Sequence, residues 1–136
     1  MFNPKFQLLN KIIKIFEEHG LYAIIDQDTI CIGKQQWDKY SKQYLYARSA
    51  APYVKQGKKS FYIFVVEQYD SNRKITKYSI KLSNQFKQPI KLYHYNLKRG
   101  SHIHKVVDGK EDKKHIKFSK KIDDIVGDIL GQMRLY

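Results

Sequence analysis

The sequence contains very little cysteine. Cys31 is the one cysteine among 136 residues, so no disulfide can form within the chain. A lone cysteine is typical of the reducing cytoplasm, and it excludes both a disulfide-stapled secreted domain and the paired CxxC motifs of zinc and redox sites. Because Cys31 lies in a short apolar segment, we expect it in the core rather than as a nucleophile. We therefore expect a cytoplasmic protein.

Long hydrophobic runs are missing as well. The longest spans residues 61–66, whereas a membrane-spanning helix needs roughly 20 apolar residues. The start of the chain does not have the pattern of a secretory signal, because Pro4 and Lys5 interrupt it. We expect no membrane partner. A hydrophobic content of 42% is ordinary for a globular protein, so residues 1–136 should form one domain.

Several catalytic signatures are absent. The 7 glycines form neither a glycine-rich phosphate loop nor a GxSxG motif. The sequence therefore gives no support to P-loop nucleotide hydrolysis or to a serine hydrolase. Chemistry has to come from other side chains, and histidine is the one that exchanges protons near neutral pH.

Acidic residues are half as frequent as basic ones. The chain has 13 Asp+Glu against 26 Lys+Arg, a net charge of +13, and residues 69–136 carry +9 of it. Such an excess favours a nucleic-acid partner, because each phosphate that is neutralised releases a counterion. The alternative is a surface that is merely rich in lysine. We expect a partner that is RNA or DNA, with RNA favoured.

The spacing of apolar residues predicts a helix near each end of the chain. Residues 4–19 have Asn3 as N-cap and apolar side chains at helical spacing. A second helix begins near Ser119, with its apolar residues on one face. The predicted fold is α+β, an antiparallel sheet of four to six strands with both helices packed on one face. The clearest strands are at 60–69, 76–82, 89–97 and 101–107.

Residues 21–57 carry a more ambiguous pattern. Residues 21–25 and 29–32 are typical of a short hairpin around a turn at 26–28. Trp37, Tyr40 and Tyr44 recur at helical spacing, which favours a short helix followed by a loop. Residues 44–47 would also suit a strand, and Pro52 then breaks the pattern.

Three of the five histidines lie close together in the sequence, at His94, His102 and His104. Successive strand side chains point to opposite faces, so the spacing His102-Ile103-His104 puts two imidazoles on the same face. Residues 98–100, Lys-Arg-Gly, are typical of a hairpin turn between the two histidine-bearing strands.

The length of this turn decides which residues meet. The favoured three-residue loop sets Asn96 opposite His102 and His94 opposite His104, and it brings all three imidazoles to one face. The two-residue alternative shifts the register by one. It sets Tyr95 opposite His104 and turns His94 to the other face.

An imidazole cluster in a basic chain could cleave RNA. In the two-residue register, a tyrosine–histidine pair that includes Tyr95 and is flanked by Lys98, Arg99 and Lys105 resembles a metal-free RNase site. There one imidazole would take the proton of a 2′-hydroxyl, another would protonate the leaving oxygen, and Arg99 would stabilise the developing charge. With all three imidazoles on one face, the rings could likewise divide the acid and base roles. The predicted catalytic residues are thus His94, His102, His104 and Arg99. This mechanism needs no cofactor, although three imidazoles could also hold a divalent metal. The predicted nucleic-acid-binding residues are the surrounding tyrosines and lysines, Tyr93, Tyr95, Lys98, Lys105, Lys77 and Lys81.

The histidine segment resembles part of a known family. Tyr93-His94-Tyr95, followed by GSHIHKV at 100–106 and an amphipathic closing helix, is similar to the C-terminal half of the TumE-like toxins of prokaryotic toxin–antitoxin pairs. The likeness covers about residues 90–130. It implies a toxin-like endoribonuclease with an acidic antitoxin protein as partner. A homodimer is left open.

A second likeness is carried by His102-Ile103-His104. It is similar to the core of HUH endonucleases, in which two histidines around an apolar residue bind Mg²⁺ or Mn²⁺ and a tyrosine attacks DNA. The last predicted helix carries no tyrosine before Tyr136. This likeness implies a metal-dependent DNA nickase as one alternative function. A non-catalytic nucleic-acid-binding protein is the other, in which the histidines are ordinary polar residues of the sheet.

Overall fold

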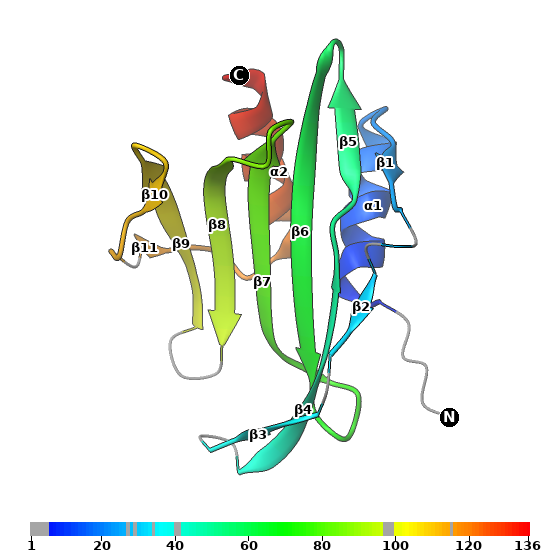
Figure 1. Ribbon diagram of the computed structural model, residues 1–136, viewed down its shortest axis with the longest axis vertical. Coiled ribbons are helices and arrows are strands. Elements are labelled where there is room, and N and C mark those ends of the chain that lie inside the picture. The colour runs from blue at the N-terminus through cyan, green and yellow to red at the C-terminus, as the bar shows by residue number, and fades with distance from the viewer. Residues whose placement is uncertain are drawn as a thin grey trace.

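The fold consists of an antiparallel sheet with two helices packed together on one of its faces (Figure 1). The computed structural model describes residues 6–26, 28, 30–33, 35–39, 42–96, 100–114 and 116–136. In chain order the elements are α1 (Leu8–Glu18), β1 (Ala23–Ile24), β2 (Cys31–Ile32), β3 (Gln36–Asp38), β4 (Gln43–Ala50), β5 (Tyr53–Gln56), β6 (Lys59–Tyr69), β7 (Ile75–Asn84), β8 (Pro89–Asn96), β9 (Gly100–Val107), β10 (Lys110–Glu111), β11 (Ile116–Lys117) and α2 (Ile122–Arg134).

Four long strands, β6 to β9, form the centre of the sheet in sequence order. β4 and β5 pair with successive parts of one edge of β6, and β10 and β11 pair with successive parts of β9. The α+β class is confirmed, but the described residues form eleven strands rather than four to six. The added strands are mostly two to four residues long, too short for a periodic signal in the sequence.

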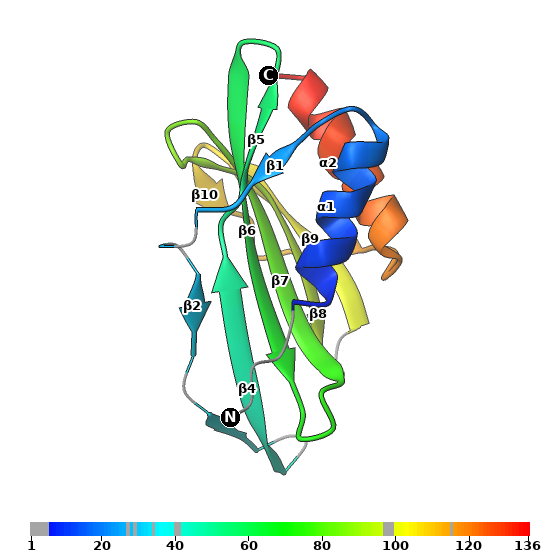
Figure 2. The same cartoon turned by 90° about the vertical axis from the view of Figure 1, so that its right-hand side faces the viewer.

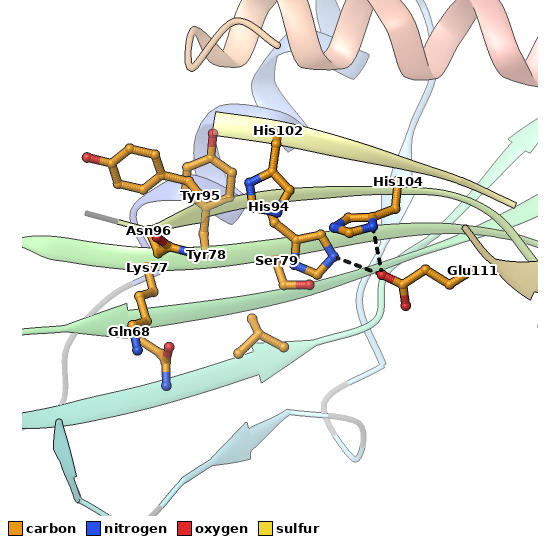
Figure 3. A pocket seen from close by; sticks show the side chains of 11 residues that line it. Gln68, Lys77, Tyr78, Ser79, His94, Tyr95, Asn96, His102, His104 and Glu111 are labelled. Carbon is orange, nitrogen blue, oxygen red and sulfur yellow. Dashed lines mark ion pairs between the residues drawn. The ribbon is translucent and has the colours of Figure 1, made fainter. Parts of the chain in front are cut away.

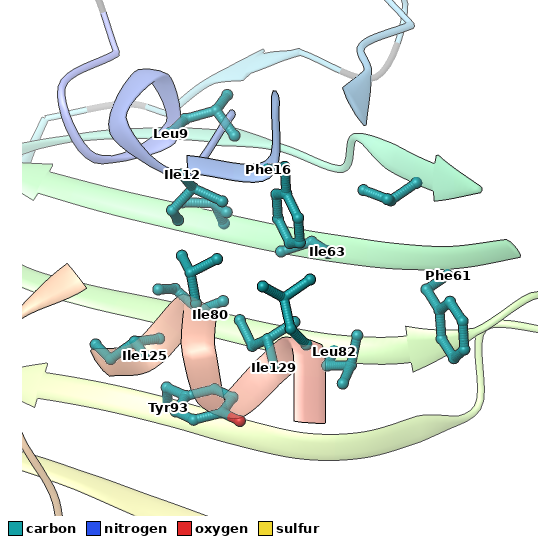
Figure 4. Packing of buried hydrophobic residues seen from close by; sticks show 14 of the residues in the cluster. Leu9, Ile12, Phe16, Phe61, Ile63, Ile80, Leu82, Tyr93, Ile125 and Ile129 are labelled. Atoms are coloured by element: carbon teal, nitrogen blue, oxygen red, sulfur yellow. The ribbon is translucent and has the colours of Figure 1, made fainter. Parts of the chain in front are cut away.

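Alternating side chains give the sheet two different faces. In β7, Thr76, Tyr78, Ile80 and Leu82 are buried, whereas the lysines and serine between them point away from the core. Figure 2 shows α1 and α2 together on the covered side of the sheet, and Figure 4 shows their apolar side chains meeting those of the central strands. Among the described residues the opposite face carries no helix, and it presents polar side chains of β7 together with Phe64 and Val66 of β6.

A buried carboxylate from the sheet caps the start of the first helix. Glu67 on β6 accepts hydrogen bonds from the backbone N–H groups of Gln7, Leu8 and Leu9, each at 3.0 Å. A carboxylate at this position satisfies N–H groups that have no partner within the helix, and it complements the helix dipole. The helix begins at Leu8 rather than at residue 4 as predicted, and Asn3 lies outside the described residues.

The predicted helix within 34–57 is wrong, because this stretch forms β3, β4 and β5. Trp37 and Tyr44 face each other across the β3–β4 hairpin with ring centroids 5.0 Å apart, so their spacing reflects a hairpin. The predicted hairpin of 21–25 with 29–32 is wrong too, since β1 pairs with β5 and β2 pairs with β4. Cys31 lies on the short edge strand β2 and is exposed, which corrects its expected place in the core.

The two described helices have 11 and 13 residues. In the part of the chain that the structure describes, no helix is long and apolar enough to cross a bilayer.

Candidate imidazole site on the helix-free face

The three histidines of β8 and β9 lie on the same face of the sheet, opposite the helices (Figure 3). His94 belongs to β8, and His102 and His104 belong to β9. Their positions follow from strand alternation, since the residues between them, Tyr93 and Ile103, are buried against the helices. The prediction that all three imidazoles share a face is confirmed.

The register of the β8–β9 hairpin differs from both predicted registers. His94 pairs with His102, Leu92 with His104, and Asn96 with Gly100. Relative to the favoured prediction the pairing is shifted by two positions, which preserves the face on which each side chain lies. The alternative that turned His94 away from the other histidines is wrong. Gly100 has φ +67°, the left-handed conformation expected of the glycine beside such a turn.

The three imidazole rings contact one another. His94 and His102 are stacked, with centroids 5.4 Å apart and planes 9° from parallel. His104 stands edge-on to both, at 4.9 Å from His94 and 5.0 Å from His102. A stacked pair with a third ring edge-on to it brings six ring nitrogens into a small volume, where they can act on the same bound group.

Glu111 completes the cluster from the edge of the sheet. The turn at Asp108 and Gly109 folds β10 back along β9, and Glu111 pairs with Val106. Its Oε1 lies 3.3 Å from Nδ1 of His104 and 3.9 Å from Nε2 of His94 (Figure 3). The next residue, Asp112, places its backbone carbonyl 2.9 Å from Nδ1 of His104. Because a carbonyl only accepts hydrogen bonds, this contact orients the His104 ring.

The cluster lines a cavity of about 430 Å³ on the helix-free face. The side chain of His104 is 8% exposed and that of His94 is 29% exposed, and His102 is buried as well. His94 is therefore the ring of the three that solvent reaches most easily. The other walls come from β6 to β8, with the polar side chains of Gln68, Lys77, Ser79 and Asn96 together with the larger residues Val66, Tyr78 and Tyr95.

Lys77 and Lys81 of β7 lie on the imidazole face, as their predicted role requires. Lys77 pairs in register with Asn96, and Lys81 with Leu92. The ammonium group of Lys77 lies 3.4 Å from a carboxylate oxygen of Asp38. The ammonium group of Lys81 lies 5.4 Å from the centre of the Phe64 ring, within range of a cation–π contact.

Tyr93 is not available to stack on a nucleic-acid base, which corrects its predicted role. Its ring is 1% exposed in the core between the sheet and α2, and its hydroxyl donates a hydrogen bond to Asp128. Burial, then the hydrogen bond to Asp128, raises the pKa of Tyr93 well above its ordinary value. Lys91 also binds the Asp128 carboxylate, at 2.7 Å.

The remaining predicted residues point to the helix side of the sheet or lie outside the described residues. Tyr95 lies on the helix side of the sheet, where its ring stacks on Tyr78 at 5.3 Å. Lys105 follows His104 in β9 and therefore points to the helix side. Arg99 and Lys98 lie outside the described residues.

Glu111 is the main functional candidate that the sequence analysis missed, because it lies in a two-residue strand that gives no periodic signal. One signal could have found it. Asp108-Gly109 is a hairpin-forming dipeptide, and a tight turn there returns Glu111 alongside β9. Lys117 was missed for a similar reason, since the two-residue strand β11 places it beside His102.

Comparison with known proteins gives no relative to guide the assignment. No protein-family model, no curated protein and no solved structure matches the chain.

Proposed function

We propose that this protein acts on nucleic acid, with the imidazole cluster of His94, His102 and His104 as its reactive site. The observation that carries the proposal is the convergence of three imidazoles and Glu111 around a cavity in a chain of net charge +13. A cavity lined by groups that exchange protons, in a strongly basic protein, suits a phosphodiester substrate. RNA is the favoured substrate, since its 2′-hydroxyl supplies a nucleophile.

The proposed reaction is an intramolecular transesterification of the RNA backbone. One imidazole takes the proton of the 2′-hydroxyl, and the 2′-oxygen forms a bond to the adjacent phosphorus. The bond from phosphorus to the 5′-oxygen breaks, and a second imidazole, in its protonated form, gives that oxygen a proton. The products are a 2′,3′-cyclic phosphate and a 5′-hydroxyl.

The arrangement suggests different roles for the three rings. His94 is the most exposed and is the natural first contact for the substrate. Glu111 and the Asp112 carbonyl hold the ring of His104, as the third member of a catalytic triad holds its histidine. His102 stacks on His94 and fixes its plane. Lys77 and Lys81 add positive charge on the same face, and Arg99 remains the predicted stabiliser of the developing charge.

The proposal is tested by incubating the untagged protein with end-labelled single-stranded RNA, with and without EDTA. We expect cleavage in both conditions and 2′,3′-cyclic phosphate ends. The His102→Ala/His104→Ala double variant should cleave about 10²–10⁴-fold more slowly. His19→Ala is the matched control, because His19 is an exposed histidine at the end of α1. Circular dichroism would establish that both variants fold.

Two results would overturn the ribonuclease proposal. If the wild-type protein retains RNA on a filter and leaves it intact, the protein binds nucleic acid without cleaving it. If single-stranded DNA alone is nicked, and only when metal is added, the HUH-like alternative replaces the proposal.

Non-catalytic nucleic-acid binding is the second candidate, and a different observation favours it. The imidazole face of β6 presents Phe64, which is 37% exposed and lies under Lys81. An exposed aromatic ring beside a cation can stack on an unpaired base and contact its phosphate. Such a surface would bind a single strand even if the imidazoles transferred no proton. A toxin-like protein of either kind would pair with an acidic antitoxin, which the charge of +13 complements.

A further inference from the structure

We propose that His94, His104 and Glu111 form a binding site for one divalent transition-metal ion, with Zn²⁺ as the representative ion. The inference concerns binding alone and stands on the geometry of these three side chains. It does not depend on the proposed cleavage of RNA.

The three potential ligand atoms are already close to one another. One ring nitrogen from each histidine and one carboxylate oxygen lie within 4.8 Å of each other. A zinc ion with ligand bonds of about 2.0–2.2 Å needs its ligands roughly 3.4 Å apart in a tetrahedral arrangement. The carboxylate oxygen lies 3.3 Å from a nitrogen of His104 and 3.9 Å from one of His94. Binding would require these atoms to approach one another by up to about 1.4 Å, a shift that side-chain rotation can supply.

The backbone supports two rigid ligands and one adjustable ligand. His94 and His104 project from paired central strands, so their rings come from a fixed framework. Glu111 lies on the edge strand β10 with its side chain 46% exposed, free to move onto an ion. The Asp112 carbonyl lies 2.9 Å from the same Nδ1 of His104, so an ion bound by this nitrogen would replace that contact.

The ligand set indicates which ions the site would prefer. Two imidazoles and one carboxylate suit Zn²⁺, Co²⁺, Ni²⁺, Fe²⁺ or Mn²⁺, whereas Ca²⁺ and Mg²⁺ prefer oxygen ligands throughout. Three protein ligands leave at least one coordination position for water. His102 lies beside the site, with its ring 5.0 Å from that of His104, but it is not one of the three ligands.

The test is a metal titration of untagged protein that has been dialysed against EDTA and then against metal-free buffer. Calorimetry with Zn²⁺ should give one ion per chain. Co²⁺ should produce visible absorption bands whose intensity reports the coordination geometry. Loss of a residue that only hydrogen-bonds to a metal ligand lowers metal affinity by up to about 100-fold. Loss of a ligand itself, in Glu111→Gln or His94→Ala, should therefore weaken binding by at least that factor. Both substitutions are at partly exposed side chains, so the fold should survive.

Two matched controls make the titration specific. His19→Ala removes an exposed histidine at the end of α1 and should leave the affinity for Zn²⁺ unchanged. His102→Ala removes the neighbouring ring and should change the affinity less than about 10-fold. Binding of less than one ion per chain, or an affinity unchanged by both Glu111→Gln and His94→Ala, would overturn the metal site.

The metal site and the proposed ribonuclease can fail separately. Stoichiometric Zn²⁺ binding by a protein that leaves RNA intact would overturn the proposed function and support the metal site. Cleavage of RNA in EDTA by a protein that binds no Zn²⁺ would do the reverse. If both hold, an ion bound to His94 and His104 occupies their lone pairs, and proton transfer in the metal-loaded protein falls to His102 or to water on the ion.

Discussion

At the scale of single residues, burial has altered the chemistry of three tyrosines. Tyr69, Tyr78 and Tyr93 are buried, and burial is the first cause that raises the pKa of each above 10.0. Because the pKa of each hydroxyl is higher in the folded protein than in the unfolded chain, its contribution to the free energy of unfolding is complete below about pH 10. That stability is lost as the pH rises above 10 toward the folded-state pKa. We therefore expect the free energy of unfolding to fall steeply above pH 10.

The alkaline dependence can be assigned to Tyr93 with one substitution. Urea unfolding of the wild type and of Tyr93→Phe, measured from pH 8 to 11.5, gives the difference in unfolding free energy at each pH. Above pH 10 this difference should shrink by about 1.4 kcal/mol per pH unit, because Tyr93 then ionises only in the unfolded chain. A difference that stays constant through pH 11.5 would show that the Tyr93 hydroxyl ionises in the folded protein.

The residue scale also shows what the sequence could and could not predict at the site. The shared face of His94, His102 and His104 was predictable, because it follows from strand alternation and survives a register error of two. The contact with Glu111 was not, since it depends on a two-residue strand that has no periodic signal. The burial of Tyr93 was not predictable, because the sequence does not show which face of β8 is buried when tyrosines and histidines alternate.

At the scale of secondary-structure elements, Glu67 joins the first helix to the sheet. It accepts hydrogen bonds from three backbone N–H groups of the first turn of α1 and one from the hydroxyl of Tyr69. Glu67→Gln keeps the shape but removes the charge and some acceptor capacity. We expect it to lower the free energy of unfolding by about 2–4 kcal/mol, measured by urea denaturation. Glu18→Gln, at an exposed position on the same helix, is the control and should change little.

The second helix contains two glycines with no structural reason to be glycine. Gly127 and Gly131 are exposed, and a Cβ added at either would meet nothing within 4 Å. Alanine at each position should raise the free energy of unfolding by about 0.5–1 kcal/mol, because glycine costs backbone entropy inside a helix. Thermal unfolding of the single variants measures this. A loss of stability at either position would mean that another backbone packs closely on this face.

Elements with strong periodicity were predictable, and short edge strands were not. β6 to β9 were placed to within two residues, since each has an unbroken run of alternating or β-branched side chains. The prediction of a helix within residues 34–57 failed because two aromatic residues that face each other across a hairpin can have the same sequence spacing as residues on one face of a helix. Tertiary pairing, which local sequence does not specify, decided the outcome.

At the scale of the whole molecule, the charge of +13 should make the proposed nucleic-acid binding sensitive to salt. The logarithm of the affinity for single-stranded RNA should fall linearly with the logarithm of salt concentration. The slope should become less steep by about 0.7 for each phosphate contact that is removed. Lys81→Gln, on the imidazole face, should reduce the slope by that amount. Lys105→Gln is the matched control, because Lys105 points to the helix side of β9. Equal effects of the two substitutions would contradict binding on the imidazole face.

The central claim is that nucleic acid meets this protein at the imidazole cluster. The most direct test is NMR of the histidine rings, assigned with single His→Gln variants, while a short non-cleavable RNA with 2′-deoxy positions is added. The account predicts that the ring signals of His94, His102 and His104 shift together and saturate, while that of His19 does not move. Saturable RNA binding that leaves all three cluster signals unchanged would contradict it.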